Sequence, residues 1–294
     1  MKSGFVSVIG RTNSGKSSLI NFLLGSKLTL VSHKQNATRR RINAIIMYEY
    51  NQIIFIDTPG LHKSTKKFNQ ALIENTFSSI NDCDLMLFVA SIFDDTSEYE
   101  NFLKYLKDNN IKTKHILILN KIDLATHTQI LSKIEEYNKF NNNFISLLPI
   151  SSKQKTYKKT LLDELCKYIP EHPYFYDPAI ISDTNEKNIF KEFILESLFE
   201  NFSEELPYCC EVLIDKILEK PNMLKIYAQI ITNSNSHKSI LIGKNGASLV
   251  RFGKMARIKI EKFTGLKIVL KLLINVKKNW QNDDNFIKKI ILNN

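Results

Sequence analysis

The sequence has little of what marks secreted, membrane-spanning or zinc-binding proteins. Its 294 residues include four cysteines (Cys83, Cys166, Cys209 and Cys210) without CxxC spacing, which disfavours a disulfide framework or a structural zinc site and suits a reducing compartment. No apolar run approaches the ~18 residues of a transmembrane helix. The N-terminus, MKSGFVSVIG, enters a strand-like segment at once and leaves no room for a signal peptide. We therefore expect a cytoplasmic protein.

Glycine and arginine are also scarce, at 9 and 6 residues, whereas lysine reaches 35, a bias typical of an AT-rich genome. The formal net charge of +11 is unevenly distributed. It is +6 over residues 1–178, −7 over 179–219, +12 over 220–278, and zero over 279–294. Genome bias explains the choice of lysine over arginine but not this segregation. The pattern predicts a focused positive surface in the C-terminal half.

The first 170 or so residues alternate between short apolar runs and helical patterns, which predicts a mixed, mostly parallel, doubly wound α/β sheet. The predicted strands are 5–9, 42–50, 53–57, 84–90, 115–119 and 144–150. The predicted helices lie near 16–24, 69–80, 97–109, 126–140 and 160–169. The connection between residues 50 and 53 is too short for a helical crossover. One antiparallel hairpin is therefore expected at a sheet edge.

A change in the sequence pattern after residue 170 predicts a second, smaller α+β domain. Pro170, Pro173 and Pro178 form a stiff connector with aromatic residues among them. The predicted helices beyond it are 186–203 (acidic, packed behind the sheet), 247–263 (basic) and 282–291, and the predicted strands are 208–218, 223–232, 239–242 and 266–276. The expected division is a first domain over 1–170, a linker over 171–182 and a second domain over 183–294.

A glycine-rich loop joins the first strand to the first helix. It matches GxxxxGK[ST] in the strand–loop–helix context that a phosphate loop requires. Its two glycines allow the backbone to wrap around phosphate, with amide hydrogens and the helix dipole directed at the anion. Lys16 is expected to bridge the outer phosphates, and the Ser17 hydroxyl to bind Mg²⁺. The predicted phosphate-binding residues are Gly10, Asn13, Ser14, Gly15, Lys16, Ser17 and Ser18.

Three later strands also end in polar residues. Asp57, in the DTPG motif, can hold Mg²⁺ through water, and the Gly60 amide can reach a γ-phosphate. Asp123, in the NKID motif, can accept two hydrogen bonds from guanine N1–H and N2–H₂, which adenine cannot offer. The other expected contacts are Asn120 to the phosphate loop, Lys121 along the base plane, and the amides of Ser151, Ser152 and Lys153 near guanine O6. Together these motifs favour GTP over ATP.

The basic C-terminal segment contains a GXXG loop, Gly243-Lys244-Asn245-Gly246, before its basic helix. In an α–β–β–α–β order this loop is typical of a type II KH domain, which clamps single-stranded RNA. The predicted RNA-binding residues are Ile242, Gly243, Lys244, Asn245, Gly246, Arg251 and Lys254. The apolar residues beside the clamp, which are Ile240, Ile242, Ala247, Leu249 and Val250, are expected to be mostly core, with one or two in the base groove. Trp280 is expected to anchor its helix rather than stack on a base.

The sequence resembles a known family. GRTNSGKS, DTPG, NKID and SSK follow the order and spacing of translation-factor-class GTPases. Asn13 and the segment NATRRR (36–41) are typical of the group that contains TrmE and Era. With a KH domain after the GTPase domain, the chain is most similar to the Era family of bacterial RNA-binding GTPases, over nearly its whole length.

The resemblance implies that Thr38 is a switch threonine that reaches Mg²⁺ and the γ-phosphate, although family members often have two threonines where this chain has Ala37-Thr38. It also implies that Asn13 holds a K⁺ ion in place of an arginine finger. Leu61 stands where Ras-like proteins carry a water-orienting glutamine, so slow intrinsic hydrolysis is expected. The expected catalytic residues are Asn13, Lys16, Thr38 and Gly60, and the expected metal ligands are Ser17, Thr38 and Asp57.

The resemblance further implies a monomer that binds single-stranded rRNA near the 3′ end of the small-subunit (16S) rRNA and acts in maturation of the 30S subunit. The alternative is a membrane-associated or other regulatory TrmE-type GTPase, peripheral at the inner membrane, whose lysines bind anionic lipid. The helix over 247–263 partly fits that alternative. A tRNA-modifying or metabolic enzyme would need a further catalytic domain, for which the residues after 178 leave no room.

Overall fold

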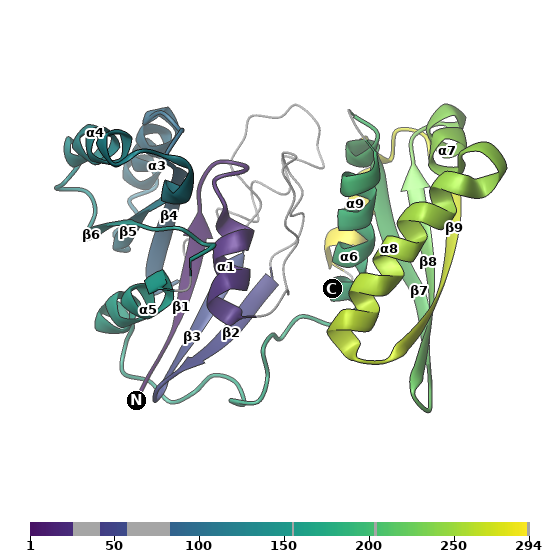
Figure 1. Cartoon of the computed structure of the whole chain (residues 1–294), viewed down its shortest axis with the longest axis horizontal. Helices are drawn as coiled ribbons and strands as arrows, with labels where there is room; N and C mark the ends of the chain where they lie inside the picture. The colour runs from purple at the N-terminus through teal and green to yellow at the C-terminus, as the bar shows by residue number, and fades with distance from the viewer. Residues whose placement is uncertain (26–41, 58–82, 155, 203–204, 293–294) are drawn as a thin grey trace. The chain divides into compact units, whose positions relative to one another are not determined.

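The computed structural model describes residues 1–25, 42–57, 83–154, 156–202 and 205–292 (Figure 1). Their contacts divide into two compact units, and the division falls between Asp183 and Thr184. The N-terminal unit holds one six-stranded sheet and the C-terminal unit one three-stranded sheet.

In the N-terminal unit the strand order is β2-β3-β1-β4-β5-β6, and all neighbours are parallel except the β2–β3 hairpin at one edge. The strands are β1 (Lys2–Ile9), β2 (Ile42–Tyr48), β3 (Asn51–Asp57), β4 (Leu85–Ser91), β5 (His115–Asn120) and β6 (Ser146–Pro149). The helices are α1 (Lys16–Leu24), α3 (Ser97–Asp108), α4 (His127–Asn138) and α5 (Thr156–Tyr168). The predicted sheet and edge hairpin are confirmed. The helix predicted near 69–80 lies outside the described residues.

The topology itself locates a ligand site. The chain moves one way across the sheet from β1 to β3 and the other way from β4 to β5. Because parallel crossovers are right-handed, α1 and α3 cover opposite faces. The reversal opens a crevice at the carboxyl ends of β1 and β4, where ligands bind in doubly wound sheets.

An aromatic cluster joins α3 and α4 to β4 and β5. Tyr99 packs edge-on against Phe88, with ring centroids 4.9 Å apart, and against Tyr137, at 5.7 Å. His115 at the start of β5 is 3% exposed, and its Nε2 lies 2.7 Å from the Tyr99 hydroxyl. Burial lowers the pKa of His115 to about 4. The ring is therefore a neutral core group.

His115 predicts a pH dependence of stability. Since its pKa is about 6.5 in the unfolded chain and about 4 in the folded one, the unfolded state binds the proton first as pH falls. Stability should therefore decrease from pH 7.5 to pH 5, with His115 contributing about 2 kcal/mol of the loss. Urea unfolding of the parent chain and of the His115→Phe/Tyr99→Phe double variant measures this. The double variant should lack that part of the pH dependence.

Tyr99→Phe alone is the control, because it removes the hydroxyl partner and keeps the imidazole. It should retain a pH dependence close to that of the parent. An equal pH dependence in the parent and the double variant would contradict the assignment to His115.

Residues 171–183, most of which were predicted to form a linker, pack along the β2–β3 edge of the N-terminal unit. The buried Gln52 amide accepts hydrogen bonds from the backbone N–H groups of Phe175 and Tyr176, at 2.9 and 3.1 Å, and donates to the Tyr176 carbonyl at 2.8 Å. Ile45 N–H donates to the Ile181 carbonyl at 2.9 Å, which extends the edge of β2. These contacts hold the segment as a strap on the first unit.

In the C-terminal unit the strands are β7 (Cys210–Lys220), β8 (Met223–Thr232) and β9 (Lys267–Val276), with β8 in the middle, antiparallel to β7 and parallel to β9. The helices are α6 (Glu186–Asn201), α7 (Asn235–Ile242), α8 (Ala247–Thr264) and α9 (Asp284–Leu292). The acidic helix α6 packs on β7 and on α8, where Lys259 bridges Glu196 at 2.8 Å and Glu200 at 2.5 Å.

One element prediction in this unit is wrong. Residues 239–242, predicted as a strand, are the last turn of α7. A four-residue apolar run cannot distinguish a strand from a buried helical turn. The helix is set by Ser234, whose Oγ caps it by accepting a hydrogen bond from His237 N–H at 3.1 Å.

Trp280 is an anchor, as predicted. Its side chain is fully buried, and its Nε1–H donates to the Cys209 carbonyl at 3.0 Å. It thereby ties the turn Trp280–Asn282 to the start of β7.

Candidate functional site

The predicted phosphate loop runs from the end of β1 to the start of α1. Gly10, Asn13 and Gly15 have φ values of 147°, 67° and 102°. A Cβ on Gly10 would lie 2.2 Å from the Val89 carbonyl oxygen, and one on Gly15 would lie 2.2 Å from Asn120 Nδ2. Both glycines are therefore required for the loop to fold closely against β4 and the end of β5.

The start of α1 is suited to an anion. Gly15 caps the helix without a side-chain hydrogen bond, and the N–H groups of a first helical turn attract anions. The neighbouring Ser14 Oγ is buried and has no hydrogen-bond partner in the described part of the chain. A phosphate would satisfy such donors.

Lys16 lies beneath this loop. It is 6% exposed, and its ammonium group donates to the carbonyl oxygens of Gly10 at 3.0 Å and Arg11 at 2.9 Å. Burial lowers its pKa to about 8, and the negative charges of Asp57 and Asp94 partly offset that effect. An incoming phosphate would stabilise the charged form of a lysine that burial disfavours.

The structure brings two of the three predicted metal ligands together. Asp57, fully buried at the end of β3, accepts a hydrogen bond from Ser17 Oγ at 2.8 Å. A hydroxyl and a carboxylate are the hard oxygen ligands that Mg²⁺ prefers, so the donor set fits this ion. The predicted Thr38 and Gly60, and also Leu61, lie outside the described residues.

The residues predicted for the base lie after β5 and β6. Asn120 links them to the phosphate loop, since its Nδ2 donates to the Ser14 carbonyl at 3.0 Å and its Oδ1 accepts from Ser152 N–H at 3.2 Å. The Lys121 ammonium group donates to the Asn13 carbonyl, and burial lowers the pKa of Lys121. Ser18 continues α1 beyond Ser17.

Asp123 is held in place by the loop after β6. Its Oδ1 accepts from Ser151 Oγ at 2.7 Å, and its Oδ2 lies 3.6 Å from the ammonium group of Lys153. The carboxylate is thus oriented by neighbours from a different strand end.

Sequence reasoning missed Asp94. It follows β4, lies 3.8 Å from the Arg11 guanidinium and acts on the charge of Lys16. Asp94 could have been predicted from the sequence, because polar residues that follow a strand of a parallel sheet tend to lie at the ligand site.

The predicted clamp of the C-terminal unit connects α7 to α8. Gly243, Asn245 and Gly246 have φ values of 72°, 53° and 79°. A Cβ on Gly243 would lie 2.4 Å from Ser248 Oγ and 2.9 Å from its backbone nitrogen, whereas one on Gly246 would meet open space. Gly243 therefore permits the tight return into α8, and Lys244 and Asn245 project at the exposed tip.

A groove of about 290 Å³ lies beside this clamp, between α8 and β9. Its lining is apolar with two cations, and Gly253 allows Leu272 to approach α8. The lining residues are Leu249, Val250, Gly253, Lys254, Arg257, Leu270 and Leu272. Such a groove can take bases on its floor and phosphates at its rim. Lys254 is one of the predicted RNA-binding residues, the β9 leucines are not, and the predicted Arg251 is exposed outside the groove.

The prediction that the apolar residues beside the clamp are mostly core is wrong. Ile240 is 54% exposed and Val250 69% exposed, and Ile242, Ala247 and Leu249 are not buried either. Leu249 and Val250 line the groove, which explains why these apolar side chains lie open to solvent.

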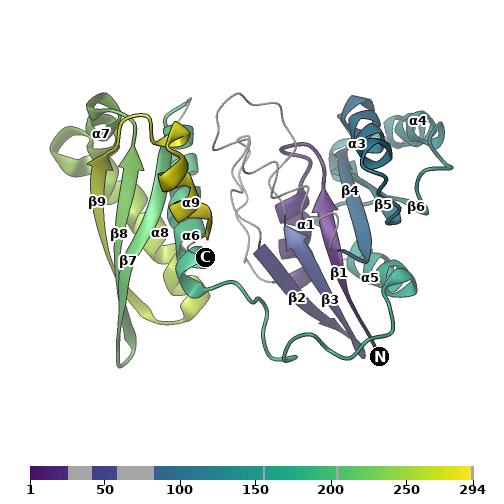
Figure 2. The same cartoon turned by 180° about the vertical axis from the view of Figure 1, so that it is seen from behind.

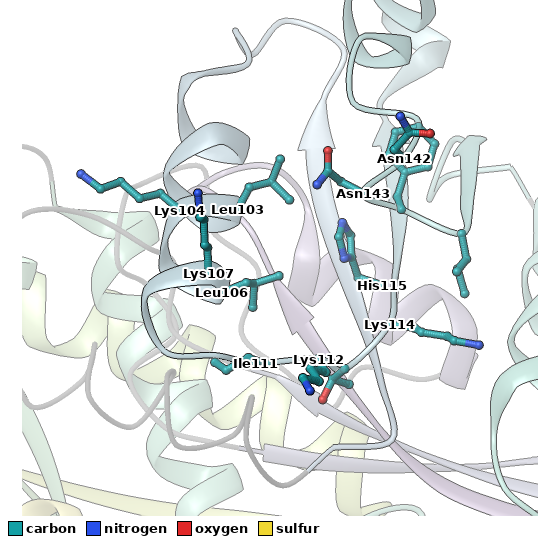
Figure 3. Close-up of a pocket in the computed structure, with 13 residues that line it drawn as sticks. Leu103, Lys104, Leu106, Lys107, Ile111, Lys112, Lys114, His115, Asn142 and Asn143 are labelled. Atoms are coloured by element: carbon teal, nitrogen blue, oxygen red, sulfur yellow. The ribbon is translucent and has the colours of Figure 1, made fainter.

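A larger hollow, of about 720 Å³, lies in the N-terminal unit, at the end of the sheet opposite the phosphate loop (Figure 3). The end of α3, the start of β5 and the segment before β6 line it, and Lys104 and Lys114 point away from its centre in that view. It is separate from the phosphate loop, because β5 begins at this hollow and ends at Asn120.

Within the described ranges, no helix is long and apolar enough to span a bilayer, and no group of three or more His, Cys, Asp or Glu side chains is arranged to hold a metal ion. None of the four cysteines forms a disulfide.

Comparison with known proteins identifies both domains. Residues 5–121 match the family model described as 50S ribosome-binding GTPase, and residues 205–281 match the KH domain. GTPase Era of Campylobacter jejuni strain 81-176 is 57% identical over 291 residues, which covers 99% of each chain. GTPase Era of Campylobacter fetus is 50% identical over 292 residues, or 99% of this chain and 100% of the relative.

Two solved structures share the whole fold. A crystal structure of a variant of Aquifex aeolicus Era bound to GDP·AlF₄⁻ has a TM-score of 0.93 and 29% identity, and covers 99% of each chain. A structure of Era in complex with MgGDPNP and nucleotides 1506–1542 of 16S ribosomal RNA has the same score and identity, and covers 99% of this chain and 98% of that one. This chain therefore belongs to the Era family, as a GTPase with a C-terminal KH domain.

Proposed function

We propose that the chain binds 16S rRNA near its 3′ end through the KH unit, under the control of GTP binding and hydrolysis, and that it acts in maturation of the 30S subunit in the cytoplasm. The observation that carries the proposal is the groove between α8 and β9 beside the Gly243–Gly246 clamp. The complex of a solved Era with nucleotides 1506–1542 of 16S rRNA supports the choice of RNA.

On the nucleotide side, the backbone of the phosphate loop and Lys16 bind the phosphates. Ser17, Asp57 and Thr38 would hold Mg²⁺, which supplies positive charge to the outer phosphates when bound. Lys16 is already buried and positioned, so it loses little conformational entropy on binding. Asn13 would hold K⁺, and Gly60 would donate its N–H to the γ-phosphate. Without a water-orienting side chain at Leu61, intrinsic hydrolysis is slow.

On the base side, Asp123 accepts the two hydrogen bonds that distinguish guanine. Its Ser151 and Lys153 neighbours fix the carboxylate before nucleotide arrives, which favours selectivity over adenine. Asn120 connects the base-binding residues to the phosphate loop, because its Nδ2 donates to the Ser14 carbonyl oxygen.

On the RNA side, phosphates lie against the Gly243–Gly246 backbone, and bases enter the groove. Lys254 and Arg257 neutralise phosphates at the groove rim, and the leucines of β9 contact the bases. GTP binding controls the affinity of this unit for RNA, and hydrolysis then releases the RNA.

Binding of a short single-stranded RNA from the 3′ end of 16S rRNA, measured by fluorescence anisotropy with GDPNP or GDP, tests the proposal. Binding should be tighter with GDPNP. The Lys254→Gln/Arg257→Gln variant should weaken binding roughly tenfold at ~0.15 M salt and reduce the salt slope by about two, because two phosphate contacts are lost.

Lys262→Gln, at the exposed end of the same helix and outside the groove lining, is the matched control and should bind like the parent. Equal affinity for RNA with GDPNP and with GDP would contradict the control of RNA binding by the nucleotide. Tighter binding to anionic vesicles than to RNA would favour the membrane alternative instead.

A further inference from the structure

The three-stranded sheet of the C-terminal unit has one covered and one open face. Helices α6 and α8 lie on the covered face, and no described element of this unit covers the other, which faces the viewer in Figure 2. Along β8, Leu224, Ile226 and Ala228 are buried beneath the helices, whereas the alternate residues Lys225 and Tyr227 are only partly buried. Lys225 and Tyr227 therefore belong to the open face.

Three lysines gather around Tyr227 on this face. Their ammonium nitrogens lie 4.7 Å (Lys216), 5.2 Å (Lys225) and 5.9 Å (Lys271) from the centre of its ring. Lys216 on β7 and Lys271 on β9 are the direct cross-strand neighbours of Tyr227. We call Lys216, Lys225, Tyr227 and Lys271 the Tyr227 surface.

The Tyr227 surface carries uncompensated charge. Among the described residues, no carboxylate lies within 4 Å of these three ammonium groups. The nearby acid, Asp215, accepts a hydrogen bond from Gln229 at 2.8 Å, and Gln229 in turn accepts one from Asn275. The hydrogen bond from Lys225 and the surrounding positive charge lower the pKa of Tyr227.

The chemistry of this surface favours a nucleic acid. Cations neutralise phosphates, and an aromatic ring among them offers a stacking platform for a base, a combination typical of surfaces that bind single strands. Leu218 and Leu273, which are 42% and 57% exposed, border the surface and extend its apolar contact area.

The open face is continuous with the clamp through the edge strand β9. Leu270 and Leu272 line the groove, whereas the alternating residues Lys271 and Leu273 are exposed. Because side chains alternate along a strand, the two surfaces lie on the two sides of one edge strand. An RNA strand that leaves the groove across β9 reaches the Tyr227 surface directly.

We propose that the Tyr227 surface is a second RNA-binding surface, which holds the phosphate backbone of the RNA segment that continues beyond the clamp. The inference rests on the proposed function, RNA binding in the groove. A KH clamp grips only about four nucleotides, so it leaves most of a longer RNA unbound. The Tyr227 surface therefore adds affinity for long RNA but not for short RNA.

The test compares two RNAs with the full-length protein bound to GDPNP. The long probe is nucleotides 1506–1542 of 16S rRNA, and the short probe is its 3′ portion of about ten nucleotides. The Lys216→Gln/Lys225→Gln/Lys271→Gln variant should bind the long RNA roughly tenfold more weakly, with a salt slope smaller by about three, and the short RNA as the parent does. Lys262→Gln is the charge-matched control for one lysine.

Tyrosine variants separate stacking from charge. Tyr227→Phe should keep the affinity for the long RNA, and Tyr227→Ala should reduce it several-fold. Unchanged long-RNA affinity in the triple variant, or equal weakening for both RNAs, would overturn the inference. If the parent binds neither RNA, the proposed function itself fails, which is a distinguishable result.

Discussion

Replacement of Lys16 by alanine is expected to lower kcat/KM for GTP hydrolysis by about 10²–10³-fold, the usual loss when one positioned charge at a reacting phosphate is removed. The lysine is buried beneath the loop and bonded to two carbonyl oxygens, so no other ammonium group can take its place without rebuilding the loop. Steady-state phosphate release in Mg²⁺ buffer measures the effect.

Lys107→Ala is the matched control, because Lys107 is exposed at the last turn of α3, away from the loop. It should hydrolyse GTP like the parent. Circular dichroism checks that Lys16→Ala is folded, because removal of the ammonium group takes a donor from the carbonyl oxygens of Gly10 and Arg11. Hydrolysis by Lys16→Ala within threefold of the parent would contradict the assigned role.

The nucleotide side was predictable because parallel strands place their carboxyl ends at one edge. Residues as distant as Ser14, Asp57, Asn120 and Ser151 meet there because each follows an apolar strand. In this fold, a polar residue after an apolar strand can therefore be assigned to the ligand site even when the other site residues are distant in the sequence. The carbonyl contacts of Lys16 and the ion pair of Arg11 with Asp94 depend on the path of the loop, which no periodicity encodes.

The RNA side was less predictable, because its groove is made between elements. The GXXG pattern located the clamp, but the Leu270 and Leu272 wall belongs to an edge strand whose residues look like ordinary core in sequence. The expectation that Val250 and its apolar neighbours are mostly core fails for the same reason. An apolar residue on a helix indicates that its side chain contacts something apolar. Only the fold shows whether that contact is with the protein's own core or with a ligand in a solvent-exposed groove.

Replacement of Asp123 by asparagine is expected to reverse the base preference. The carboxylate accepts two hydrogen bonds from guanine, and each charged hydrogen bond contributes about 1.5–3 kcal/mol, so GTP affinity should fall by at least about 10²-fold. Xanthine carries a carbonyl at C2, where guanine has an amino group, and the side-chain amide of the introduced asparagine can donate to that carbonyl. Competition of XTP and GTP for a fluorescent guanine nucleotide measures the preference.

The result depends on a carboxylate that is already oriented. Ser151 donates to Asp123 Oδ1, and asparagine keeps an oxygen there, so the substitution changes the hydrogen-bond pattern while the shape of the loop is kept. Asp108→Asn, exposed at the end of α3, makes the same chemical change elsewhere and should leave the preference for GTP intact. An unchanged guanine preference in Asp123→Asn would refute the role of this residue, and selectivity would then have to come from the backbone of Ser151–Lys153.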